Sequence, residues 1–208
     1  MTTRNRLLGG ALALALLPAA GWAQTTTLLS ENFNELTPQL AVTSVGAFSA
    51  IDGSNVDLVG GGLFGYLCVA PTTIICVDLD GSGGKSQGML QSNSAFTLVP
   101  GVDYYLSFDL IGSQRGNTAS ASVDFGPYSQ TFTLASGDVS GGIISNELVT
   151  VSAPTTAFLT FSSNTPGNVG TLLDNVTLTS RRAAVPEPGT LGLAALGLLA
   201  LGVRRKRG

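Results

Sequence analysis

The chemistry that this sequence can support begins with its carboxylates, because the chain contains no histidine. Asp78 and Asp80 stand two positions apart, directly before the glycine-rich run 81–84. Carboxylate oxygens at this spacing, ahead of a flexible turn, can bind a hard cation such as calcium. The segment departs from an EF-hand loop, since its twelfth position is Met89 rather than glutamate. Two interpretations follow: a calcium site at Asp78 and Asp80, or a solvated acidic turn.

The absence of histidine also limits the enzyme classes that the chain could belong to. It excludes Ser-His-Asp triads, Cys-His pairs and histidine zinc sites. Two carboxylates in one cleft could still hydrolyse a glycosidic bond. Asp109 and Asp124 are such a pair, each on the polar side of an expected strand, but solvated surface acids would show the same pattern. No phosphate-binding loop or dinucleotide fingerprint is present, and we expect no catalytic residues.

Cys68 and Cys76 are the only cysteines of the chain. In an oxidising compartment an even number of cysteines predicts a disulfide, and the turn-forming residues 71–73 between them favour two neighbouring strands. The alternative is two free, buried thiols. A catalytic cysteine is not expected, because no histidine can activate it.

Charge is distributed very unevenly along the sequence. The full chain has a formal net charge of −3, yet eight of its ten basic residues lie near the two ends. Between residues 24 and 180 only Lys85 and Arg115 are basic, against twelve acidic residues, which gives this region a charge of −10. Such a surface repels nucleic acid. It suits solubility, divalent cations or neutral glycans.

The middle of the chain shows a period of two, which is typical of strands with one buried face. Apolar side chains alternate with polar ones in two long runs: Tyr104, Leu106, Phe108 and Leu110, and then Ala119, Ala121, Val123 and Phe125. The segments 96–98, 156–161 and 172–179 also fit strands, and Gly, Ser, Asn and Pro separate these runs. No helical stripe is found between residues 24 and 180. We therefore predict an all-β fold with a single β-sandwich or jelly-roll domain.

This central region resembles the jelly-roll ectodomains of choice-of-anchor surface proteins, which are similar to galactose-binding-like folds. The similarity rests on 76–92 (CVDLDGSGGKSQGMLQS), 96–113 (FTLVPGVDYYLSFDLIGS) and 171–179 (TLLDNVTLT). It implies a structural calcium between the first strand, at Glu31 or Asn32, and Asp174 on the last strand. Asp174 falls in line with apolar residues, so its carboxylate needs either a cation or backbone N–H donors.

Glycan binding is the binding function that we consider first. Sugars stack on exposed aromatic rings, and the strand-rich region 24–180 has no tryptophan, because the one tryptophan of the chain is Trp22. Tyr105 lies opposite the apolar face of its strand, and Tyr128 follows Pro127 in an expected loop. Both tyrosines are candidate glycan contacts, although either could simply pack at a sheet edge.

The N-terminus has the pattern of a secretory signal peptide. Arg4 and Arg6 precede the apolar stretch 7–17, and small residues follow up to Ala23. We predict export through the Sec machinery with cleavage after Ala23. The alternative, a retained anchor, is disfavoured because the apolar stretch is too short for a comfortable span.

The C-terminus combines three features in a fixed order. A Pro186-Glu187-Pro188 break is followed by the uncharged run 189–203, a predicted hydrophobic transmembrane helix. The basic stop then consists of four consecutive cations: Arg204, Arg205, Lys206 and Arg207. As a helix, 190–203 would reach about 21 Å, short of the ~30 Å hydrocarbon core. Length alone leaves an ordinary anchor or a buried helix as alternatives.

This order resembles the PEP-CTERM sorting signal of Gram-negative bacteria, over about the last 24 residues. The resemblance implies recognition of the tail by exosortase, a membrane cysteine protease, during export to the surface. We therefore expect a signal peptide (1–23), an ectodomain (24–180), a linker (181–185) and a sorting signal (186–208). The expected protein is a non-enzymatic, structural or polysaccharide-associated component of the cell surface or extracellular matrix, transiently anchored in the inner membrane. A surface glycan hydrolase is the alternative.

Overall fold

The computed structural model describes residues 23–60, 65, 68, 75–85, 87–138 and 143–182, with the backbone alone for 143–146. The chain divides into two compact units, Gln24–Ala183 and the combined terminal segments. The predicted signal peptide, apart from Ala23, and the predicted sorting helix lie outside the described residues. Among the residues described, no helix is long and apolar enough to cross a membrane.

The unit Gln24–Ala183 is built from two antiparallel sheets and one additional strand pair. The larger sheet has the order β12 (Ile143–Val149), β9 (Val102–Ile111), β15 (Leu172–Arg182), β6 (Ile75–Asp78), β5 (Val56–Gly60) and β2 (Gln39–Val42), and β1 (Gln24–Glu31) also pairs with β15. The smaller sheet has the order β11 (Tyr128–Leu134), β10 (Ala119–Phe125), β14 (Leu159–Ser163), β7 (Met89–Ser92), β4 (Phe48–Ala50) and β3 (Ser44–Val45). The remaining pair is β13 (Thr155–Ala157) with β8 (Phe96–Leu98).

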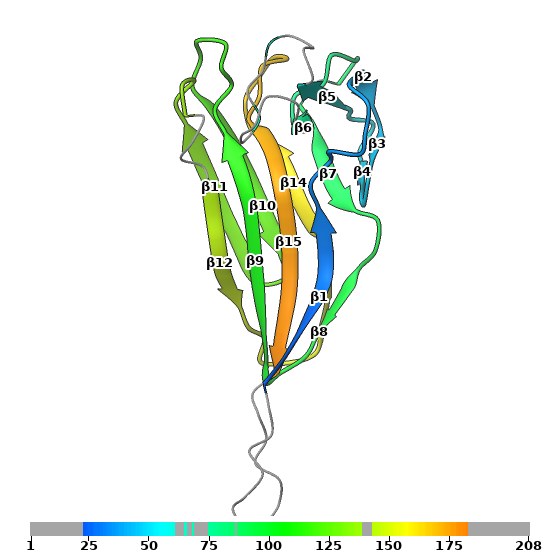
Figure 1. Cartoon of the computed structure of the whole chain (residues 1–208), viewed down its shortest axis with the longest axis vertical. Helices are drawn as coiled ribbons and strands as arrows, with labels where there is room; N and C mark the ends of the chain where they lie inside the picture. The colour runs from blue at the N-terminus through cyan, green and yellow to red at the C-terminus, as the bar shows by residue number, and fades with distance from the viewer. Residues whose placement is uncertain are drawn as a thin grey trace, which may run out of the picture. The chain divides into compact units, whose positions relative to one another are not determined.

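The two sheets face each other across one hydrophobic core, so the predicted all-β sandwich is confirmed (Figure 1). Alternating side chains of β9 and β10 enter this core, as their sequence period of two predicts. The expected strand 156–161 is in fact two strands in different sheets, β13 and β14. They are separated at Phe158, which is 43% exposed.

Phenylalanine rings connect the two layers of the sandwich. Phe161 of β14 is fully buried and packs against Phe108 of β9 with ring centroids 5.3 Å apart. Phe108 also contacts Phe132 at 5.7 Å, and Phe161 contacts Phe48 at 6.0 Å. Offset and edge-to-face ring pairs add stability beyond the burial of apolar area. This cluster therefore fixes how the two sheets pack.

Strand β15 lies in the middle of the larger sheet. It pairs with β9 along one side, and on the other side with β6 near its start and with β1 over the rest of its length. Gln24 is opposite Arg182, so β1 begins and β15 ends at the same end of the sandwich (Figure 1). The strand includes Arg181 and Arg182, which the sequence assigns to the linker 181–185.

A β-bulge interrupts β15 at Asn175. The register with β9 shifts between Asp174 and Thr177, and Asn175 has a φ of 49°. Asparagine tolerates this left-handed backbone better than most residues. The extra residue reverses the alternation, so that Asp174 does not share a face with Val176.

Candidate functional site

The outer face of the larger sheet, on the side away from the core, carries four buried aspartates: Asp57, Asp78, Asp109 and Asp174. Four buried apolar residues lie on the same face. These aspartates follow or precede core residues on their strands, which places them on the opposite face. Cross-strand pairing joins Asp57 with Asp78 and Asp109 with Asp174. The apolar neighbours on this face form a separate small cluster: Val59, Cys76, Ile111 and Leu172.

The predicted disulfide between Cys68 and Cys76 is confirmed. Cys76 belongs to β6 and is fully buried in the small apolar cluster, against which Cys68 packs. The bridge therefore ties Cys68 to the outer face of the larger sheet.

Asp57 and the glycine-rich loop hold each other in place. The Asp57 carboxylate accepts hydrogen bonds from the backbone N–H of Ala41 at 2.7 Å and of Ser82 at 2.9 Å, and from the Ser82 hydroxyl. The Asn55 side chain accepts from Gly83 N at 2.8 Å and donates to the Lys85 carbonyl at 3.0 Å. A Cβ at Gly81 would lie 2.0 Å from Asn55 Oδ1, so a side chain there would clash. The loop therefore encloses two polar side chains, that of Asp57 in β5 and that of Asn55, the residue directly before β5.

Asp78 and Asp80 are buried, at 2% and 0% exposure, rather than forming a solvated turn. Asp78 Oδ1 accepts from Asp80 N at 2.9 Å and from Gly170 N at 3.2 Å. Burial raises the pKa of Asp78 to about 7. The two hydrogen bonds lower this pKa, and the negative charges of Asp80 and Asp57 raise it further. Burial also raises the pKa of Asp80 to about 6, although the Ser163 hydroxyl and the Val169 N–H oppose the shift.

Asp174 is fully buried on the outer face, beside Asp109 of β9. Its Oδ1 accepts from the Asn175 N–H at 2.7 Å, whereas its Oδ2 has no hydrogen-bond partner among the described residues. Burial raises the pKa of Asp174 to about 7, and the charge of Asp109 contributes to the increase.

Glu31 is the last residue of β1, and Asn32 follows it. Glu31 is opposite Val176, a core residue, so its side chain is on the inner face of the sheet. Its carboxylate accepts from Phe33 N at 3.0 Å and Ala47 N at 2.9 Å, and Asn32 accepts from Asn34 N at 3.2 Å. Glu31 and Asp174 therefore lie on opposite faces of the sheet, separated by the bulge at Asn175, and the calcium site with Asn32 and Asp174 stays a prediction.

The acid pair Asp109 and Asp124 is also separated. Asp109 is on the outer face of the larger sheet, whereas Asp124 is exposed on the outer face of the smaller sheet. The two carboxylates therefore lie on opposite sides of the sandwich and cannot flank one glycosidic bond. No group of three or more His, Cys, Asp or Glu side chains within the described ranges is arranged to hold a metal.

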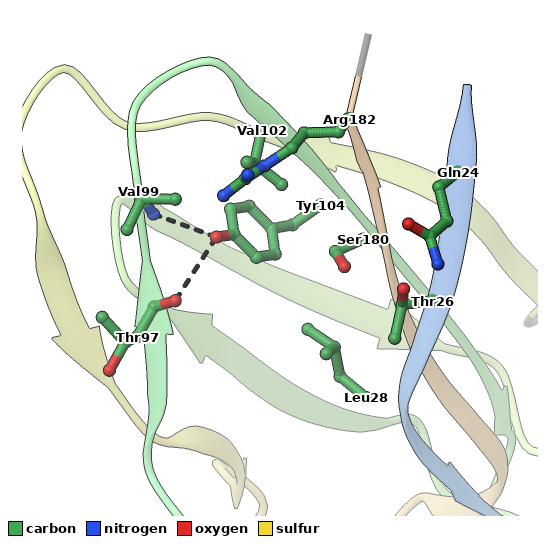
Figure 2. A pocket seen from close by; sticks show the side chains of 9 residues that line it. All are labelled: Gln24, Thr26, Leu28, Thr97, Val99, Val102, Tyr104, Ser180 and Arg182. Carbon is green, nitrogen blue, oxygen red and sulfur yellow. Dashed lines mark hydrogen bonds between the residues drawn. The ribbon is translucent and has the colours of Figure 1, made fainter. Parts of the chain in front are cut away.

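A groove of about 490 Å³ opens at the end of the sandwich where β1 begins and β15 ends. Its floor contains Tyr104 and Val102 of β9, and Leu28 of β1 is 38% exposed there. Figure 2 shows polar side chains from three strands around this floor. They are a guanidinium, an amide and three hydroxyls: Arg182, Gln24, Thr26, Thr97 and Ser180.

The position of Tyr104 in the groove is fixed by its hydroxyl. The hydroxyl accepts a hydrogen bond from Val99 N at 2.9 Å and donates to the Thr97 carbonyl at 3.3 Å (Figure 2). The ring is 3% exposed, and the side chain of Arg182 lies across it in Figure 2. The sequence pattern assigns Tyr104 to the apolar face of its strand but marks none of the groove residues as a ligand contact, because the groove depends on register among β1, β9 and β15.

The two tyrosines predicted as glycan contacts have different surroundings. Tyr105 is half-buried on the outer face of the larger sheet, where it pairs with Leu148, 55% exposed, and with Thr179. Tyr128 packs against the core, and its hydroxyl donates to Gln130 at 3.3 Å. Burial and the charge of Glu147 raise the pKa of Tyr128 to about 12. These contacts favour a packing role for Tyr128, and Tyr105 stays a predicted contact.

Comparison with known families identifies the C-terminal segment. Residues 184–207 match the PEP-CTERM protein-sorting motif, which confirms the resemblance of the tail. This motif indicates an exported protein that is transiently anchored in the membrane through its C-terminus and processed by exosortase. No curated protein matches the chain.

Solved structures give low similarity scores. The chain is 15% identical to the CBM22-1-GH10 modules of a Clostridium thermocellum xylanase, with a TM-score of 0.43, covering 76% of this chain and 29% of that one. It is 14% identical to the K3 adhesin domain of Porphyromonas gingivalis Lys-gingipain, with a TM-score of 0.44 and coverage of 75% and 99%. For the CBM22-1 xylan-binding domain of Paenibacillus barcinonensis Xyn10C, identity is 17%, the TM-score 0.37 and coverage 79% and 98%. Scores this low carry no inference about function.

Proposed function

We propose that this protein is a non-catalytic component of the cell surface or extracellular matrix of a Gram-negative bacterium and that it binds neutral polysaccharide. The observation that carries the binding part is the groove at the β1 and β15 end. It combines an apolar floor with amide, guanidinium and hydroxyl groups. Sugar rings need both kinds of surface, since they present C–H faces as well as hydroxyls. Ligand sites in general combine apolar lining with a few placed polar groups.

The charge of the domain favours a neutral glycan over an anionic one. The region 24–180 carries a formal charge of −10, which repels acidic polymers. The nine described residues that line the groove include no acid, and Arg182 is the one cation among them. An arginine at this position can donate to sugar hydroxyls through its planar set of N–H groups. A neutral polysaccharide can accept hydrogen bonds from the donors in the groove, and the acidic surface elsewhere on the domain does not repel it.

Export places the domain where such a polymer occurs. The sorting motif at 184–207 accounts for delivery through a transient membrane anchor. Strand β1 begins at Gln24, directly after the predicted signal-peptide cleavage position. We propose that the Sec machinery exports the chain, that Ala23 precedes the mature N-terminus, and that exosortase acts near Pro186-Glu187-Pro188.

The test is retention on the exopolysaccharide of the host organism. The full chain would be produced in that host, extracted in mild detergent, and passed over immobilised polysaccharide. We expect Arg182→Gln to weaken retention about tenfold, equivalent to ~1.4 kcal/mol for lost charge-assisted hydrogen bonds. Arg181→Gln is the matched control, because Arg181 is next to it in β15 but pairs with Asp103 on the outer face.

Two results would contradict the groove as the binding site. Equal loss in both arginine variants would indicate a general charge effect. Loss with Tyr105→Ala, together with normal retention of Arg182→Gln, would move the binding surface to the outer face around Tyr105 and Leu148. No retention of the wild-type protein on any host polysaccharide would refute the proposed function.

A further inference from the structure

Several buried oxygen atoms gather where β6 ends, next to the start of β15. Asp80 is fully buried, and neither of its carboxylate oxygens has a hydrogen-bond partner among the described residues. Thr171 is also fully buried, and its hydroxyl is likewise unpartnered within the described part. We propose that Asp80, together with Asp78 and Thr171, binds a hard divalent cation, with calcium as the first candidate.

Backbone contacts of residues 170–171 bring these three residues into one neighbourhood. Gly170 N donates to Asp78 Oδ1 at 3.2 Å, and Leu79 N donates to the Thr171 carbonyl at 3.0 Å. A Cβ on Gly170 would lie 2.9 Å from Asp80 Cγ and 3.0 Å from Asp78 Oδ1. Gly170 is therefore in close contact with both carboxylates, which a larger residue would force apart.

Asp80 needs a partner that offsets the burial of its carboxylate. Neither of its oxygens has a hydrogen-bond partner in the described region, and an unpaired buried carboxylate is costly. Ser163 and Val169 lie close to Asp80, but neither has the geometry of a hydrogen bond to its carboxylate. A cation would satisfy the two carboxylate oxygens and the Thr171 hydroxyl together, because all three are hard oxygen ligands.

This site differs from a calcium loop formed by the glycine-rich segment. Residues 81–85 are engaged with Asn55 and Asp57 instead. Asp57 already accepts three hydrogen bonds from Ala41 and Ser82. The ligands that we propose therefore come from the end of β6 and from the residue before β15, two segments about 90 residues apart in sequence. A cation there would join β6 to β15 in addition to their short ladder of backbone hydrogen bonds.

The experiment measures thermal unfolding of the full chain in detergent at pH 8, after EDTA treatment and then with added calcium. With calcium at a hundredfold excess over its Kd, we expect an increase in Tm of roughly 5–10 °C. Asp80→Asn is expected to abolish the increase. Asp124→Asn, which removes an exposed carboxylate from the other sheet, is the matched control and should keep it.

A second measurement keeps the test decisive if Asp80→Asn folds poorly. Elemental analysis of the purified chain should find about one calcium per molecule in the wild type, and much less in Thr171→Val. The proposal is overturned if calcium does not change the wild-type Tm and no metal is found. It is also overturned if Asp80→Asn raises the Tm at pH 8 in EDTA and leaves an unchanged calcium response. Binding of polysaccharide is not part of either readout, so failure here is separate from failure of the proposed function.

Discussion

Asp109 and Asp174 face each other across β9 and β15 on the outer side of the larger sheet. Asn175, the residue of the bulge, contacts both of them. Its side-chain amide donates to Asp109 Oδ2 at 2.7 Å, and its backbone N–H donates to Asp174 Oδ1 at 2.7 Å. One asparagine in a left-handed conformation thus supplies hydrogen bonds to two neighbouring buried carboxylates. It does not satisfy Asp174 Oδ2, which leaves one buried oxygen unpaired among the described residues.

This arrangement predicts that the metal-free domain is most stable in mild acid. The folded pKa values of Asp78 and Asp174 are about 7 and that of Asp80 about 6, against 3.8 for an unperturbed aspartate. The folded state therefore binds more protons than the unfolded state between about pH 4 and pH 7. The free energy of unfolding should fall as the pH rises through this window, by on the order of 2–4 kcal/mol between pH 5 and pH 8. Urea unfolding of the full chain in EDTA measures this dependence.

The variant Asp174→Asn tests how much of the pH dependence of stability comes from Asp174. The amide carries no charge, so the variant should lose some of the decrease between pH 5 and pH 8 and be more stable than wild type at pH 8. Asp124→Asn should unfold with the wild-type pH dependence, because Asp124 is exposed. A wild-type stability that rises steadily from pH 5 to pH 8 in EDTA would contradict the raised pKa values.

The sequence predicted the strands that alternate regularly, since β9 and β10 place apolar side chains in the core at every second position. It could not predict the bulge at Asn175, because that backbone depends on a contact with Asp109, which is 66 residues away in sequence. Aspartates on the polar side of a strand suggest solvated surface, yet Asp109 is 7% exposed. Whether the outer face of a sheet is covered depends on the path of other segments, which periodicity does not report.

Removing the disulfide should lower stability without changing the fold. The bridge spans eight residues in sequence, so loop closure in the unfolded chain predicts a loss of about 2.5 kcal/mol for Cys68→Ser with Cys76→Ser. Urea unfolding of this double variant would be compared with wild type under non-reducing conditions. Thiol titration of the denatured, unreduced wild type should find no reactive thiol, whereas two thiols would show that the bridge does not form in the exported protein.

The phenylalanine cluster should contribute much more stability than an exposed phenylalanine on the same part of the chain. Phe161→Ala removes a fully buried ring that contacts Phe48 and Phe108, so we expect a loss of about 3–5 kcal/mol. Phe158→Ala changes a residue that is 43% exposed, between β13 and β14, and should cost less than about 1 kcal/mol. Equal losses in the two variants would show that the packing of the sheets does not depend on this cluster.

The distance between the folded domain and the sorting motif should control the rate of processing. Strand β15 is paired on both sides as far as Arg182, and three residues separate Arg182 from Pro186. Fully extended, three residues span only about 10 Å. A protease that needs extended substrate around Pro186-Glu187-Pro188 must therefore work close to the end of the sheet or unpair it.

Inserting an eight-residue Gly-Ser spacer after Ala183 should accelerate processing several-fold in a pulse-chase experiment in the host, with the Tm of the domain unchanged. The same spacer placed in the exposed turn at Gly126 and Pro127 is the control, and it should leave the rate at the wild-type value. Equal rates for the wild type and the Ala183 insertion would show that the processing enzyme reaches the motif without hindrance from the folded domain.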